Sequence, residues 1–161
     1  MKLFTNKNSQ KGFTLIELLV VIGILAILLA ITLIAINPAR QFGNANNTAR
    51  RSAATQILNA IGQHMAENGG ILHASITNLD MVANPAGLEL NEANFAGLCA
   101  VLVPDFIPAL PTNPTLAADD IEEADCATYT QTDYRIARDP NNRITVDAMT
   151  TDNGEVISVT R

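Results

Sequence analysis

The chain is poor in aromatic residues and lacks the residue patterns that most enzymes need. Its 161 residues include no Trp, and aromatic residues make up only 4%, which gives little support for an aromatic electron-conduction role. It contains no Ser/His/Asp or Cys/His set, glycine-rich phosphate loop or metal motif, so an enzyme is the weakest interpretation. His64 and His73 have no nucleophile or ligand cluster near them in sequence, and both are interpreted as structural or exposed.

Lysine occurs only near the N-terminus. Lys2, Lys7 and Lys11 precede a long apolar run, and the other seven cationic residues are all Arg. Residues 13–161 contain these seven Arg and sixteen carboxylates, so their net charge is −9. Such a balance keeps an exported domain soluble, and this subunit is not expected to bind nucleic acid directly because phosphate contacts need clustered cations.

Residues 13–36 form the apolar run, which contains a single formal charge, at Glu17. As a helix they would extend roughly 36 Å, enough to span a bilayer. Three lysines before the run and none after it predict a cytoplasmic N-terminus and a translocated C-terminal domain. An ordinary secretory signal has an apolar region of only ~7–15 residues. A plain uncleaved membrane anchor explains the lysines and the length, but it does not explain Glu17.

The segment Lys11–Glu17 reads KGFTLIE, and it resembles the processing site of type IV prepilins and pseudopilins. The resemblance covers the first forty or so residues closely and the remainder only loosely. It implies that a membrane-bound prepilin peptidase cuts after Gly12 and methylates the new N-terminal residue, Phe13. The mature protein would then begin at Phe13.

Glu17 is the residue to which the resemblance assigns an assembly role. A carboxylate in a bilayer helix costs roughly 2.5–3.5 kcal/mol on insertion scales. A cut after Gly12 creates an α-ammonium at Phe13, one helical turn from Glu17. In the family, the glutamate pairs with the N-terminal amine of a neighbouring subunit, which neutralises both charges. The alternative is a tolerated glutamate near the membrane edge.

Gly23 and Pro38 each weaken a continuous helix, so a local helix break is expected at these residues. Resemblance to pilins suggests that residues 24–38 lose helical structure in a filament. Alternatively, Pro38 is the first residue of a second helix capped by Asn37. Residues 44–67 repeat apolar side chains at three- and four-residue spacing, which predicts an amphipathic helix ending at Glu67-Asn68-Gly69-Gly70.

The polar face of this helix carries Arg40, Gln41, Arg50 and Arg51. We interpret it as a solvated or subunit-contacting face in preference to a nucleic-acid surface. Residues 71–118 are rich in loops, with a short helix expected around Glu92–Leu102, capped by Asn91 and carrying Cys99.

An acidic stretch precedes the second cysteine. Its five carboxylates belong to Asp119, Asp120, Glu122, Glu123 and Asp125. Some pseudopilins bind calcium in a C-terminal loop, but the glycine and alternating ligands of a calcium loop are missing here, so a solvated acidic loop is favoured and no cofactor is expected.

Cys99 and Cys126 are expected to form a disulfide if this half of the chain is outside the cytoplasm, with a pair of buried thiols as the alternative. Short alternating segments at Thr130–Arg138, Arg143–Met149 and Glu155–Thr160 predict an antiparallel meander. Its apolar face would cover the amphipathic helix. The expected fold is therefore α+β, with a leader at 1–12, a membrane and assembly helix at 13–36, an amphipathic helix at 37–70 and a globular head at 71–161.

The expected function is that of a structural subunit of a type IV pilus or pilus-like filament, polymerised through its N-terminal helix. Its partners would be copies of itself, the prepilin peptidase and an inner-membrane assembly platform. The precursor would cross the inner membrane once, before moving to a surface filament or a periplasmic pseudopilus. The alternatives are a type II secretion pseudopilin and a membrane-anchored binding module that never polymerises. The head carries no motif that decides between adhesion, motility and DNA uptake.

Overall fold

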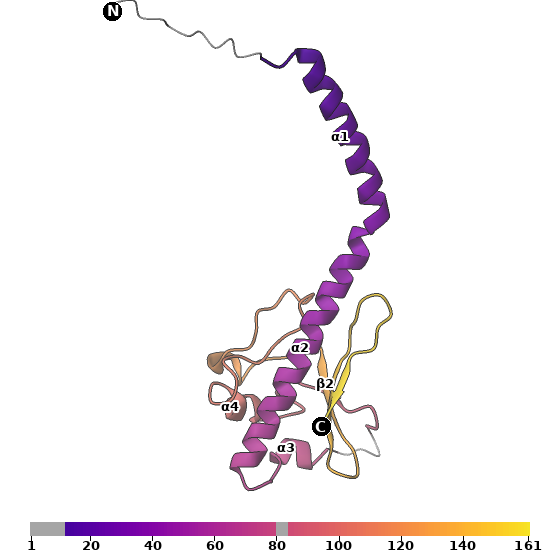
Figure 1. Cartoon of the computed structure of the whole chain (residues 1–161). Helices are drawn as coiled ribbons and strands as arrows, with labels where there is room; N and C mark the ends of the chain where they lie inside the picture. Colours follow the sequence, from indigo (N-terminus) through magenta and orange to yellow (C-terminus); the bar gives the residue numbers. More distant parts are fainter. Residues whose placement is uncertain (1–11, 80–83) are drawn as a thin grey trace, which may run out of the picture. The chain divides into compact units, whose positions relative to one another are not determined.

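The structure, a computed structural model, describes residues 12–79 and 84–161 (Figure 1). The chain divides into two compact units, Met1–Gln41 and Phe42–Arg161, and each has its own architecture. From here on, the second unit, Phe42–Arg161, is called the head. Lys2, Lys7 and Lys11 of the basic leader lie outside the described residues. The fold is α+β: helices α1 and α2 follow one another in the chain, and a small antiparallel sheet accompanies the second.

Helix α1 spans Leu15–Ile36 and runs without interruption through Gly23. The break expected at Gly23 is therefore not found in the isolated chain. One glycine costs a helix only about 1 kcal/mol, which a run of Leu, Ile and Ala around it tolerates. The helix ends instead at Asn37, whose φ of 41° and ψ of 80° are left-handed. Loss of helix over residues 24–38 in a filament remains a prediction.

Helix α2 spans Pro38–Glu67 and begins six residues before the expected amphipathic segment. Proline suits the first helical position because the amide hydrogen it lacks has no helical partner there. The backbone amide of Arg40 donates to the backbone oxygen of Asn37 at 3.1 Å and to its side-chain Oδ1 at 3.4 Å. Asn37 thus caps α2, as the second interpretation of Pro38 predicted. At the other end, Gly69 and Gly70 have positive φ, and the Gly70 amide donates to the Met65 carbonyl at 2.8 Å.

The sheet has four antiparallel strands in the order β1-β2-β3-β4, which are Leu88–Glu89, Tyr134–Arg138, Ile144–Ala148 and Ser158–Thr160. The last three confirm the expected meander, although β2 and β4 begin several residues later than predicted. Strand β1 was not predicted, because two residues carry no alternating pattern. Its approach to β2 requires Gly87, where a Cβ atom would lie 2.3 Å from the carbonyl oxygen of Ile136.

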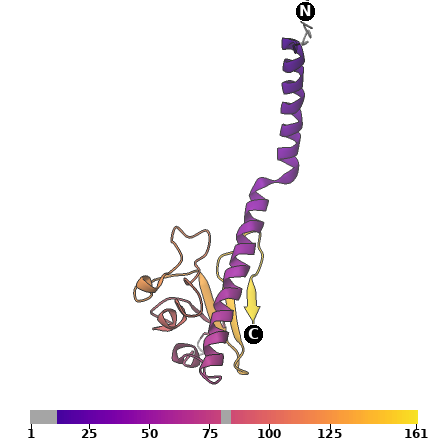
Figure 2. The same ribbon diagram turned by 60° about the vertical axis from the view of Figure 1, so that its left-hand side comes forward.

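One hydrophobic core joins α2 to the sheet within the second unit. Ile57 of α2 and Ile136 and Val146 of the sheet are completely buried, and each such side chain contributes about 1.5–3 kcal/mol. In Figure 2, α2 lies along the sheet with β4 beside it, and Arg161 at the end of β4 donates to the side-chain oxygen of Asn59 on α2 at 2.9 Å. The expected packing of the meander on the amphipathic helix is confirmed.

Three short elements complete the second unit: α3 at Ala74–Thr77, α4 at Leu98–Leu102 and the 3-10 helix η1 at Glu123–Asp125. The helix expected from Glu92 is shorter than predicted, because Gly97 with φ 73° forms the start of α4. Asn91 caps only a turn, by accepting the Asn94 amide at 2.9 Å. Cys99 lies on α4, as expected.

Candidate functional site

The leader junction lies directly before α1. Gly12, Phe13 and Thr14 are exposed and are not part of the helix, so the chain after Gly12 is accessible. Thr14 has φ −81° and ψ 151° and acts as the N-cap of α1. A protease needs an extended, accessible substrate chain, and this segment provides one.

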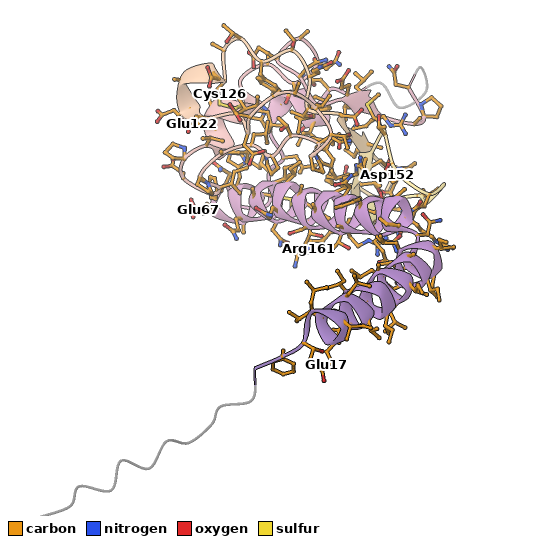
Figure 3. All side chains as sticks on the ribbon, turned by 90° about the horizontal axis from the view of Figure 1, so that it is seen from above. Glu17, Glu67, Glu122, Cys126, Asp152 and Arg161 are labelled. Carbon is orange, nitrogen blue, oxygen red and sulfur yellow. A yellow bond between two sulfur atoms is a disulfide. The ribbon has the colours of Figure 1, made fainter. Side chains whose placement is uncertain are left out.

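Glu17 and Thr14 form a reciprocal capping box. The amide and hydroxyl of Thr14 both donate to Glu17 Oε2, at 2.8 and 2.7 Å, and the Glu17 amide donates to the Thr14 hydroxyl at 3.3 Å. Figure 3 shows the Glu17 side chain at the N-terminal end of the helix, pointing away from it. The Thr-x-x-Glu spacing was visible in the sequence, but its capping role was missed. One carboxylate oxygen is thus held locally, and the side chain stays exposed to a partner.

The surface of α1 is entirely exposed and, apart from two residues, apolar. None of its residues is buried, and it is the one helix among the described residues that is long and apolar enough to cross a membrane. Its polar exception besides Glu17 is Thr32, whose hydroxyl donates to the Leu29 carbonyl at 2.9 Å. Such a surface needs lipid or other apolar helices around it.

One known protein family matches this region of the chain. Residues 7–33 match the family described as prokaryotic N-terminal methylation motif. The chain carries the class III leader of type IV pilins and pseudopilins. The motif supports a type IV pilin-like or pseudopilin precursor, which is a structural class and not an enzyme class. No curated protein and no solved structure matches the chain.

The head that follows the class III leader is cross-linked. Cys99 on α4 and Cys126 after η1 form a disulfide, which is the expected pairing, and both residues are buried. The bridge closes a segment with a sequence separation of 27, for which chain entropy gives roughly 3–4 kcal/mol of stabilisation. It fixes the acidic stretch at its C-terminal end.

Arg50 departs from the sequence interpretation, which placed it on the polar face of α2 beside Arg40, Gln41 and Arg51. Its exposure is 0%, because loops distant in sequence cover it. Its guanidinium donates to four side-chain oxygens, those of Asp152 at 2.7 Å, Asn47 at 2.8 Å, Asn113 at 3.0 Å and Thr115 at 3.1 Å. A buried cation needs this set of acceptors, and the pattern along α2 alone could not reveal partners 63 to 102 residues away.

The loop between β3 and β4, residues 149–157, is held on α2 by the same network, which we call the Arg50 clamp: Asn46, Asn47, Arg50, Arg51, Asp152 and Glu155. Asn47 donates to the Asp152 carbonyl at 2.8 Å and to Glu155 at 2.9 Å, and Arg51 forms an ion pair with Glu155. Asp152 lies against the α2 side chains in Figure 3. Hydrogen bonds from Arg50 and then from Asn46 lower the pKa of Asp152. Asp152 therefore keeps its negative charge to a lower pH than an isolated aspartate does.

The acidic stretch and the histidines gather no metal-binding set among residues 12–79 and 84–161. Asp120 Oδ1 accepts the backbone amide of Thr112 at 2.9 Å, so it holds a loop. The ring centroids of His64 and His73 are 6.1 Å apart, and His73 Nδ1 lies 2.8 Å from the Ser75 hydroxyl and caps α3. Burial, and then the neighbouring His64, lower the pKa of His73.

Proposed function

We propose that the chain is a filament subunit of the type IV pilus class, processed after Gly12 and polymerised through α1. The observation that carries the proposal is the methylation motif at residues 7–33 on a helix with no buried residue. Apolar helices with this exposure are stable in lipid before assembly and among copies of themselves afterwards.

Processing creates the charge that Glu17 pairs with. Cleavage of the Gly12–Phe13 peptide bond by water gives a carboxylate on Gly12 and an amine on Phe13. The peptidase then replaces one N–H hydrogen of this amine with a methyl group from an electrophilic methyl donor, with release of a proton. Because methylation of an amine retains its positive charge, the Phe13 ammonium attracts the Glu17 carboxylate of an adjacent subunit. An apolar environment disfavours each of these charges alone. Their pairing therefore favours the alignment of neighbouring helices that brings the two together over shifted alignments.

The capping box provides hydrogen-bond donors for the Glu17 carboxylate before assembly. In the precursor, the Thr14 amide and hydroxyl satisfy one carboxylate oxygen, which lowers the cost of holding the charge near lipid. During assembly, the Phe13 ammonium of a neighbouring subunit donates hydrogen bonds to the remaining lone pairs of the Glu17 carboxylate. Glu17 would thus never be without a hydrogen-bond donor.

The intact mass of the protein from sheared filaments tests processing. A mature chain that begins at methylated Phe13 is expected, and any other start contradicts the cleavage site. Glu17→Gln tests assembly: the variant is expected to insert and to be processed, but to yield few or no filaments. Thr32→Ala is the matched control in the same helix, and its filament yield should be unchanged.

The location of the assembled protein distinguishes a pilus from a secretion pseudopilus. A major pilin should dominate sheared surface filaments. A pseudopilin would stay in the periplasm, and a non-polymerising anchor would give only membrane-bound monomers.

A further inference from the structure

An apolar groove lies at the C-terminal half of α2, where this helix meets the sheet. Its volume is about 190 Å³, and its apolar lining comes from Leu58, Ile61, Met65, Leu72 and Ile144. Gly62 also lines the groove, and a Cβ atom added there would lie 3.7 Å from Arg161 Nη1. The missing side chain at Gly62 thus contributes to the open space.

Two arginines at the rim of this groove already have partners within the chain. Arg143 Nε forms an ion pair with Asp139 at 2.6 Å, and Arg161 Nη1 donates to Asn59 Oδ1 at 2.9 Å. An apolar group can therefore enter the groove without separating a cation from water alone. A groove with an apolar floor and a satisfied polar rim is suited to an apolar ligand.

Phe42, at the start of α2, is the aromatic side chain that the head leaves in solvent. It is 71% exposed, whereas the other aromatic residues described in the head are buried or half-buried, namely Phe95, Phe106, Tyr129 and Tyr134. Aromatic residues are enriched in protein interfaces, because a covered ring buries about 150–250 Å². Phe42 is thus the head residue whose burial by a partner would gain most.

The Phe42 ring and the groove match in size. An apolar cavity of about 150 Å³ holds a benzene molecule, so a groove of about 190 Å³ admits a phenyl ring. Phe42 cannot fill the groove of its own chain, because it precedes Leu58 by 16 residues on the same helix, which is about 24 Å. A Phe42 ring in this groove would therefore belong to a second copy.

Assembly through α1 brings Phe42 to neighbouring copies. Phe42 follows Ile36, the last residue of α1, by six positions, so an interface formed by α1 continues along the chain to Phe42. The next residue, Gly43, is buried under the β3–β4 loop, where a Cβ atom would lie 2.7 Å from Asn153 Nδ2. The head therefore covers the helix beside Phe42 but leaves the ring itself to a partner.

We propose that the Phe42 ring of one copy docks in the groove at the C-terminal half of α2 of a second copy. The contact joins two different patches, so it is heterologous and repeats along an open helical assembly. The inference rests on the proposed filament function and names a contact that the head contributes to it.

Removing the ring and filling the groove test this contact in the full-length chain. Phe42→Ala should reduce the yield of sheared filaments by about fivefold or more, because buried aromatic anchors dominate interface energies. Gly62→Leu should reduce it similarly, because the new side chain occupies the groove, while replacement of a helical glycine does not weaken α2. The double variant should lose no more than either single variant, because both changes remove the same contact.

Two matched controls lie outside the contact. Val156→Ala shortens a side chain of the head that is 85% exposed, and Gln56→Leu adds to α2 the same side chain as Gly62→Leu, at a position that does not line this groove. Both variants should give the wild-type yield. Equal membrane levels of every processed variant show that folding and insertion are intact.

Chemical cross-linking gives a second measurement that keeps Phe42 and Gly62 in place. Filaments carrying Ala45→Cys with Met65→Cys, treated with a short bis-maleimide, should give a ladder of multimers, because the native cysteines are held in a disulfide. Within one chain the two positions are 20 residues apart on α2, about 30 Å, so the reagent links only different copies. Ala45→Cys with Glu123→Cys should give mainly monomers.

The outcomes separate the contact from the filament function. Wild-type chain that forms no filaments in the presence of the assembly machinery overturns the proposed function. Wild-type filaments with unaffected Phe42→Ala or Gly62→Leu variants, or without the multimer ladder, overturn the contact and leave the filament function standing. Loss of Phe42→Ala from the membrane would show that the ring anchors the chain in lipid, which also overturns the contact.

Discussion

Helix α1 and the head solve the problem of apolar surface in opposite ways. None of the α1 residues is buried, whereas Ile57, Ile136 and Val146 of the head are completely buried within one core. Charged side chains of the head also pair with one another, in the Arg50 clamp and in the surface pair between Arg143 and Asp139. The stability of the head therefore comes from its own contacts, while α1 depends on lipid or on other copies of itself.

The comparison makes its strongest prediction for the separated head. Residues 42–161 contain the core, the sheet, the disulfide and the clamp, so this fragment should fold without α1. We expect it to be monomeric and to unfold cooperatively in urea, and we expect it to be missing from membranes and filaments. Urea unfolding and analytical ultracentrifugation check this. A molten or aggregated fragment would show that the head needs α1.

Within the head, the largest single effect is expected at the Arg50 clamp. Arg50→Ala removes the charge-assisted hydrogen bonds to Asn113 and Asp152 and leaves a cavity in place of a buried side chain, so it should lower the free energy of unfolding by about 3 kcal/mol. Arg51→Ala is the matched control, because its pair with Glu155 is exposed and should contribute less than about 1 kcal/mol. Urea unfolding of both variants of the fragment measures the difference. Equal losses would mean that burial of Arg50 adds nothing.

The disulfide is expected to have an effect of similar or slightly smaller size. Cys99→Ser/Cys126→Ser should lower the free energy of unfolding by about 3 kcal/mol, because the unfolded chain regains conformational freedom. Mass spectrometry before and after reduction verifies the bridge. A native chain whose thiols react with a labelling reagent would contradict the pairing.

The smallest effect is a pH dependence at the corner between α2 and α3. His73 caps α3 through Nδ1 and has a lowered pKa, so the unfolded state binds more protons than the folded state just below pH 6.5. Stability should be complete above that pH and should fall as the pH drops towards the lowered value. His73→Asn keeps a capping side chain without a titrating group, and it should flatten this part of the profile. Asp152 acts separately, below its ordinary pKa of 3.8.

Sequence patterns predicted the parts of the fold whose causes are local. The apolar run and the meander follow from residues within a few positions of one another. The turn between β2 and β3 is also local, because the Asp139 carboxylate accepts the Asn141 and Arg143 amides at 2.8 Å. Arg50 could not be predicted to be buried, because arginine is mostly exposed and the partners that allow its burial come from two distant loops. Strand β1 exists only because Gly87 lets the chain approach Ile136 closely.

The candidate site divides in the same way. The leader junction and Glu17 were visible as a short motif, while the Arg50 clamp depends on the path of loops that no local pattern describes. A capping box could have been found from Thr14 and Glu17 alone. Features whose residues are close in sequence can thus be predicted from sequence, and those whose residues are far apart require the folded chain.

The separation of 102 residues between Arg50 and Asp152 has a consequence for biosynthesis. A ribosome delivers Arg50 well before it delivers Asp152. Until the β3–β4 loop has been made, the Arg50 guanidinium lacks its carboxylate partner. The hydrogen bonds that join α2 to this loop therefore form only after the loop has been synthesised.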